Sequence, residues 1–168
     1  MHMMDAHTLA RLIDAHAAAL VLYARQWCAA AEDVVQEAFV KLAGCRPPPD
    51  NPAAWLHRVV RHAASSAARS EKRRRTHERR AAGRAASWFL PSEGADLDAR
   101  QAAQALEQLP LEMREPLVAH LWGGLTFEQI GELIGASAST AHRRYLAGLE
   151  ALRERLRLPC PDHPKTRD

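Results

Sequence analysis

Apolar residues recur every three or four positions along most of this chain, which is the spacing expected for one face of an α-helix. No segment alternates apolar and polar residues as a half-buried strand does, and alanine is abundant while β-branched residues are sparse. The pattern predicts an all-α fold. The expected helices cover residues 8–27, 32–42, 53–75, 97–109, 110–122, 126–134 and 137–158.

Prolines and glycines mark the boundaries between these helices. The segment 45–52 contains four prolines and cannot be helical, and Asn51 is placed to cap the helix after it. Pro116 lies inside a predicted helix, where it predicts either a kink or a later start. The expected organisation is a helical domain over 1–80, a linker over 81–100 and a second helical domain over 101–168 that ends in a frayed tail.

The predicted linker contains three large apolar residues in succession, Trp88, Phe89 and Leu90. A contiguous apolar patch of this kind is expected to be covered. Two explanations remain open: one of the two domains packs on this apolar segment, or a partner binds it.

The segment from Thr126 to Leu152 predicts a helix-turn-helix. Thr126 and Gln129 fit a capping box, Gly135 permits the left-handed turn, and Ser137 can cap the second helix. The second helix is expected to bury Ala141, Tyr145 or Leu146, Leu149 and Leu152. An ordinary helical hairpin is the alternative. If the motif binds DNA, its first turns enter the major groove. The candidate DNA-binding residues there are Ser139, Thr140, His142, Arg143, Arg144 and Leu146.

The formal net charge of +3 is unevenly distributed along the chain. Basic residues dominate 58–84, acidic residues dominate 93–115, and the last predicted helix is basic again. Two basic zones separated by an acidic one suggest two contacts with a polyanion, although solvated helix faces would have a similar composition.

A different polar face is predicted on the second helix. Asp33, Gln36, Glu37 and Val40 share one stripe, because residues three or four positions apart lie on the same side of a helix. The stripe indicates either a contact surface or a solvated acidic face.

Five segments of the chain, taken in order, resemble those of a known protein family. LPLEMREPL at 109–117, GLTFEQIGELIG at 124–135 and STAHRR at 139–144 resemble region 4 of RNA polymerase sigma factors. AEDVVQEAF at 31–39 resembles region 2.2, and WLHRVVRHA at 55–63 resembles regions 2.3 and 2.4. The resemblance extends from about Leu9 to Leu156 in the family's order, and it is to the small, extracytoplasmic-function (ECF) type.

The resemblance implies a function and partners. The second domain would read the −35 promoter element and sit on the β flap of core RNA polymerase. The first would bind the β′ clamp helices and open the −10 element, and an anti-sigma factor would be a further partner. The implied polymerase-binding residues are Glu32, Asp33, Gln36, Glu37 and Phe39. The implied −10 and upstream DNA-binding residues are Arg58, Arg61, His62, Arg69, Lys72, Arg73 and Arg74.

Other functions are not expected. The nine histidines are scattered and the three cysteines are far apart, so we expect no metal site and no disulfide framework. No catalytic arrangement and no phosphate loop is found, so we expect neither an enzyme nor a cofactor. No apolar run is long enough for membrane insertion and no secretion signal is found, which favours the cytoplasm. A helix-turn-helix regulator with a helical sensory or dimerisation domain is the alternative, and the match at 31–39 argues against it.

The charge distribution also suggests how the free protein is arranged. We expect the acidic segment before Pro110 to lie near the basic helix, with Trp88 and Phe89 between the two domains. Such a closed form would limit nonspecific binding of the basic helix to DNA.

Overall fold

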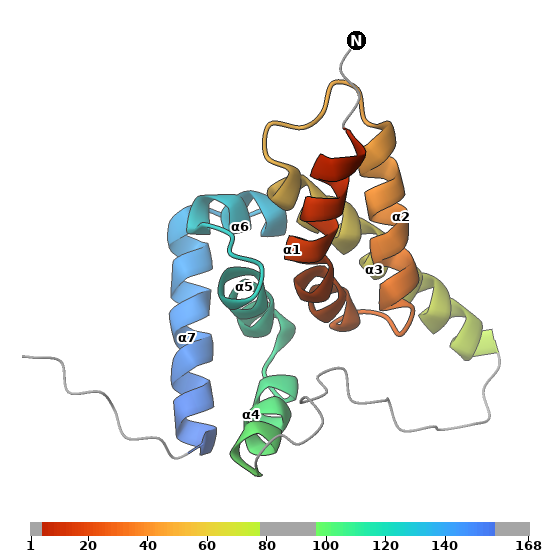
Figure 1. The fold of residues 1–168 in the computed structure, drawn as a ribbon. Coiled ribbons are helices and arrows are strands. Elements are labelled where there is room, and N and C mark those ends of the chain that lie inside the picture. Colours follow the sequence, from red (N-terminus) through yellow and green to blue (C-terminus); the bar gives the residue numbers. More distant parts are fainter. Residues whose placement is uncertain (1–4, 78–96, 157–168) are drawn as a thin grey trace, which may run out of the picture.

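The computed structural model describes residues 5–77 and 97–156, and the predictions about Trp88, Phe89 and the tail fall outside these ranges. Within the described residues all regular secondary structure is helical, which confirms the predicted all-α class (Figure 1). Each predicted helix is present, with ends shifted by at most two residues. The helices are α1 (Ala6–Arg25), α2 (Ala31–Gly44), α3 (Pro52–His77), α4 (Leu97–Glu107), α5 (Leu111–Leu121), α6 (Phe127–Ile134) and α7 (Ala138–Leu156).

Two groups of helices follow the chain order. Helices α1, α2 and α3 pack against one another around Leu20, Leu42 and Leu56, none of which is exposed (Figure 1). Helix α7 packs against α4, α5 and α6, with Leu117 and Ile130 fully buried. We refer to these groups as the N-terminal half and the C-terminal half. The exact domain boundaries given above, 1–80, 81–100 and 101–168, stay a prediction.

The helix ends use the caps that the sequence predicts. The Asn51 side chain accepts the Ala54 amide at 3.0 Å at the start of α3. Thr126 and Gln129 form both hydrogen bonds of the capping box. Gly135 has φ +70°, a conformation that costs glycine little, and Ser137 accepts the Thr140 amide at 3.1 Å. Together these residues set the sharp turn between α6 and α7.

Pro116 does not delay the start of its helix, so the expectation of a later start is wrong. Helix α5 runs from Leu111 through Pro116, which is buried. The proline ring removes one backbone donor, that of residue 116, and the helix continues on both sides of it.

The two halves contact each other. Helix α1 lies against α5 and α3 lies against α6, and one cluster of buried apolar residues continues from the first half into the second (Figure 1). The structure is therefore a closed arrangement of the two halves.

Candidate functional site

The predicted recognition helix presents its polar residues to solvent. Ser139, His142 and Arg143 are exposed at the start of α7, whereas Thr140 and Arg144 are partly covered. Leu146 is 49% exposed, and Tyr145 instead packs against the core. Tyr145 is thus the inward residue of the two alternatives, which leaves Leu146 on the same outer face as His142 and Arg143.

An aromatic cluster holds this part of α7 against α6. The Phe127 ring stacks on His120, with centroids 4.5 Å apart, and also contacts Tyr145 at 5.3 Å. The His142 ring lies 4.7 Å from the same Phe127 ring. His120 is fixed in turn by a contact of 2.8 Å between its Nδ1 and the Leu125 carbonyl. Sequence reasoning missed His120 and Phe127, because their contact with α7 depends on how the turn folds back.

The basic face of α3 is largely open. Most of the cationic side chains predicted to contact DNA on this helix are exposed, and only Arg61 is half-buried. The exposed members are Arg58, His62, Arg69, Lys72, Arg73 and Arg74. These exposed cationic side chains therefore all lie along α3, and the last of them lie beyond the part of α3 that is buried in the N-terminal half.

Helix α2 carries the predicted acidic stripe. Asp33, Gln36 and Glu37 are exposed. The Glu37 carboxylate accepts a salt bridge of 2.8 Å from Lys41, and Glu32 pairs with Arg25 of α1. These side chains stand beside a hollow between α1 and α2.

That hollow is an apolar groove of about 480 Å³. Phe39 is only 6% exposed and lines it from within, whereas Val40 is 67% exposed and Ile13 is 38% exposed. The apolar lining residues are Leu9, Ile13, Ala17, Val21, Val35, Phe39, Val40 and Ala43. Sequence reasoning missed the contribution of Leu9 and Ile13, because helical spacing identifies the apolar face of α1 but not which part of that face a neighbouring helix leaves open.

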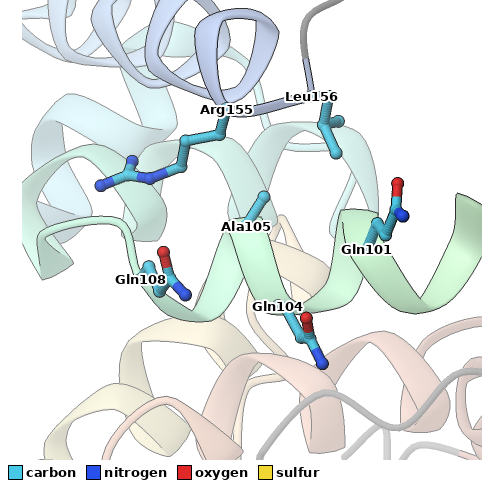
Figure 2. Close-up of a pocket in the computed structure, with 6 residues that line it drawn as sticks. All are labelled: Gln101, Gln104, Ala105, Gln108, Arg155 and Leu156. Atoms are coloured by element: carbon cyan, nitrogen blue, oxygen red, sulfur yellow. The ribbon is translucent and has the colours of Figure 1, made fainter.

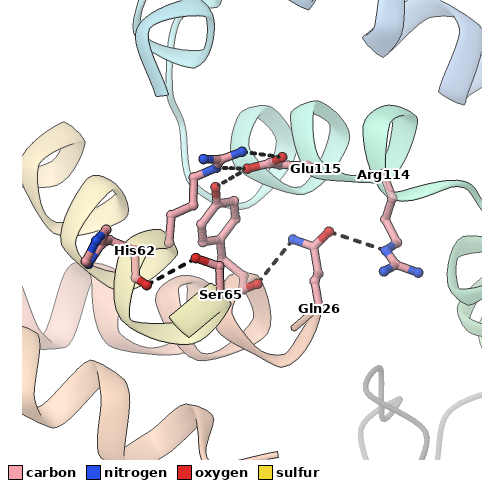
Figure 3. A network of polar contacts seen from close by, with 7 residues as sticks. Gln26, His62, Ser65, Arg114 and Glu115 are labelled. Atoms are coloured by element: carbon pink, nitrogen blue, oxygen red, sulfur yellow. Dashed lines mark hydrogen bonds and ion pairs between the residues drawn. The ribbon is translucent and has the colours of Figure 1, made fainter. Parts of the chain in front are cut away.

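A buried polar cluster joins the two halves (Figure 3). Glu115 of α5 is 5% exposed and accepts two hydrogen bonds on Oε1, one of 2.7 Å from the Tyr23 hydroxyl and one of 2.6 Å from Arg61 Nε. Gln26 Oε1 lies 3.4 Å from Arg114 Nε, and Arg114 also donates to the Glu107 carbonyl at 2.9 Å. Burial, reinforced by the Glu115 carboxylate, raises the pKa of Tyr23 well above its ordinary value, so this phenol stays protonated and donates.

This cluster contains a contact between an acidic and a basic segment. The Glu115 carboxylate, which lies beyond Pro110, pairs with Arg61 of the basic helix. The expected position of the acidic segment before Pro110 stays a prediction. Its partner, Arg61, is a predicted DNA-binding residue of α3 that is tied to the other half. The hydrogen bond from Arg61 to Glu115 raises the pKa of that guanidinium. A buried carboxylate requires paired donors, and Arg61 and Tyr23 both reach it.

Comparison with known proteins gives the family. Residues 12–74 match Sigma-70 region 2, and residues 99–152 match Sigma-70, region 4. The RNA polymerase sigma factor CarQ of Myxococcus xanthus is 30% identical over 131 residues, which are 76% of this chain and 75% of the relative. This chain belongs to the sigma-70 family of RNA polymerase sigma factors. The matches confirm the predicted function in transcription initiation, with α1–α3 in region 2 and α4–α7 in region 4.

A solved structure has a similar fold. It is the sigma factor RpoE of Bartonella quintana, crystallised in complex with the anti-sigma factor NepR. The match has a TM-score of 0.69 and 21% sequence identity, and covers 90% of this chain and 97% of that one. The similarity extends over both halves of the sigma factor described here.

A second hollow of this sigma factor is polar, unlike the groove between α1 and α2. It has a volume of about 440 Å³ and lies between α4 and α7 (Figure 2). Gln101, Gln104 and Gln108 line it from α4, and Arg155 and Leu156 lie across from them at the end of α7. The amides and the guanidinium are well hydrated groups, so this hollow lacks the apolar surface that drives protein docking.

Two further features concern metals and membranes. Within residues 5–77 and 97–156, no group of three or more His, Cys, Asp and Glu side chains is arranged to hold a metal ion. None of the helices in those same ranges combines the length and apolar character needed to cross a bilayer.

Proposed function

We propose that this sigma factor, of the ECF type, binds core RNA polymerase through the outer face of α2 and the adjoining groove. In the same complex α3 contacts the −10 region and α7 contacts the −35 element. The observation that carries the proposal is the exposed stripe of Asp33, Gln36 and Glu37 beside an open apolar groove.

The groove and the stripe suit a helical partner such as the β′ clamp helices. Apolar side chains in a groove take up the apolar face of an incoming helix. The carboxylates beside it set orientation and association rate through charge complementarity with basic residues of the partner. Phe39 would act from the floor of the groove, whereas Val40 and Ile13 would contact the partner directly.

The exposed face of α7 supports −35 recognition. Arg143 is suited to a bidentate contact with guanine, and Leu146 is placed for an apolar contact such as a thymine methyl. Ser139, Thr140 and Arg144 would bind phosphate and fix the orientation of the helix. The contact between His142 and Phe127 would keep the start of α7 aligned while it does so.

The basic face of α3 supports a role in opening the −10 element. Arg58 and His62 would lie near the separated strand, and the residues from Arg69 to Arg74 would follow upstream phosphates. Arg61 could join them only after leaving Glu115. DNA binding by α3 and the closed arrangement of the two halves would therefore compete for this one guanidinium.

The remaining partners follow from the same proposal. The C-terminal half would bind the β flap, and an anti-sigma factor would hold the protein inactive in the cytoplasm. The protein would act by binding alone, without a catalytic step and without a cofactor. A helix-turn-helix regulator would bind duplex promoters unaided and would not depend on α2.

Charge reversal on α2 tests the proposal. We expect Asp33→Lys combined with Glu37→Lys to abolish binding to core polymerase, because like charges placed together at an interface cost several kcal/mol. Co-purification with core enzyme and promoter-directed run-off transcription are the two measurements. Undiminished binding by a variant with normal helicity would refute the assigned surface.

The groove can be tested separately. Val40→Asp should also weaken core binding while leaving stability unchanged, because Val40 is mostly exposed in the free protein. The matched control is Ala10→Asp, an exposed position on α1 that does not line the groove. Equal effects of the two variants would show that added charge, and not the groove, is responsible.

A further inference from the structure

His57 lies inside the contact between the two halves. It belongs to α3, has no exposed surface, and faces the turn that joins α5 to α6. A Cβ atom placed on Gly123 of that turn would lie 2.6 Å from His57 Nε2 and 2.5 Å from the Ala119 carbonyl oxygen. The glycine backbone therefore rests directly on the imidazole, and any larger residue there would push the halves apart.

The hydrogen bonds of His57 fit only a neutral ring. Nδ1 lies 2.9 Å from the Ala53 carbonyl, so Nδ1 carries the proton and donates it. Nε2 is buried and has no hydrogen-bond partner in the described part of the protein. Protonation would place an N–H and a positive charge at Nε2, where neither is satisfied, and that costs free energy in a buried site.

The charged and titratable groups around His57 offer little compensation. Helix α1 contributes His16 and Tyr23, whose ring lies 5.2 Å from the imidazole. Arg61 follows one turn later on α3, and the Glu115 carboxylate of α5 is already bonded to Arg61 and Tyr23. Burial lowers the pKa of His57; its hydrogen bond to the Ala53 carbonyl opposes this, and the nearby His16 adds to it.

We propose that His57 makes closure of the two halves sensitive to pH, with the neutral imidazole holding them together and the imidazolium releasing them. The inference rests on the packing of the halves, so it stands or fails independently of the proposed polymerase and DNA contacts. Opening the halves would also free Arg61 from Glu115.

The direction follows from linkage. The imidazole has a lower pKa in the closed form than in water, so protons bind preferentially to the open form. Closure is therefore fully favoured above the ordinary histidine pKa of about 6.5 and weakens as the pH falls below it. If the closed form stays unprotonated, the ratio of open to closed molecules should rise about tenfold between pH 7.5 and pH 5.5.

The test is the distance between fluorescent non-natural amino acids placed at Ala18 and Glu150 of the full chain, both exposed in the closed form. Between pH 7.5 and 5.5 we expect a growing long-distance population at constant helicity. His57→Leu should remove the pH dependence, and His57→Gln provides a second neutral side chain in case leucine disturbs folding. The matched control is His7→Gln, an exposed histidine on α1, which should behave as the unmodified chain.

Four outcomes would overturn the proposal. The first is a distance distribution that does not change with pH. The second is a pH dependence that persists in both His57 variants. The third is a pH dependence that disappears in His16→Gln while His57 is intact. The fourth is loss of helicity over the same pH range, because His57 would then control folding of the N-terminal half and not closure.

Discussion

Helices α3 and α7 are both proposed to contact promoter DNA, yet the closed arrangement treats them differently. The residues of α7 proposed to read bases, Arg143 and Leu146, remain exposed. Helix α3 instead contributes Arg61 and His57 to the contact with the other half. Closure therefore leaves this face of α7 exposed, whereas it engages Arg61 of α3 and fixes how α3 and α7 lie relative to each other.

The largest expected effect comes from removing Glu115, which joins the two halves. Glu115→Ala would leave Tyr23 and Arg61 without their shared acceptor, and removing one partner of a buried ion pair costs about 3–5 kcal/mol. Since Arg61 is 36% exposed, we expect the lower end, about 3 kcal/mol, measured as a shift of the open–closed equilibrium. Glu112→Ala, an exposed carboxylate on the same helix, is the matched control and should have no effect.

The second largest effect is expected at α7, where base contacts and phosphate contacts can be told apart. We expect Arg143→Ala to cost about 1–3 kcal/mol on the preferred −35 sequence and to relax its selectivity, as loss of a bidentate base contact would. Arg144→Ala is the matched variant and should weaken all sequences alike. Binding titrations against a set of substituted −35 duplexes distinguish the two. Unaltered selectivity in Arg143→Ala would mean that other residues of α7 read the bases.

The smallest expected effect lies in the turn that positions α7. Thr126→Ala removes the side-chain acceptor of the capping box, and such a change costs about 1 kcal/mol. Urea unfolding of the full chain measures it. Because this capping box lies within the C-terminal half, the distance between the halves should not change, in contrast to Glu115→Ala.

Local features of this fold were predictable from sequence. Asn51, Thr126, Gly135 and Ser137 act within a few residues of where they stand, so turn and cap chemistry alone identifies their roles. The exposed stripe on α2 follows from helical periodicity for the same reason. Arg143 was likewise placed on the outer face of α7 by spacing and capping alone, whereas the choice between Tyr145 and Leu146 as the buried residue needed the structure.

Contacts between the halves were not predictable in the same way. Arg61 and Glu115 are 54 residues apart, and no periodic signal distinguishes Arg61 from the exposed Arg58 on the same helix. His57 and His62 also share α3, yet one is fully buried and the other is exposed. Net charge describes a whole segment, so it could not identify Glu115 as the carboxylate that pairs with Arg61.

We predict that the two halves are closed in the free sigma factor and separate on core polymerase, because Arg61 can join the DNA contacts of α3 only after it leaves Glu115. Labels at Ala18 and Glu150 report it directly when the distance distribution is measured at low salt, first in the free chain and then in complex with core enzyme. We predict one short-distance population for the free chain and one long-distance population for the complex. The same distribution in both states would contradict the account.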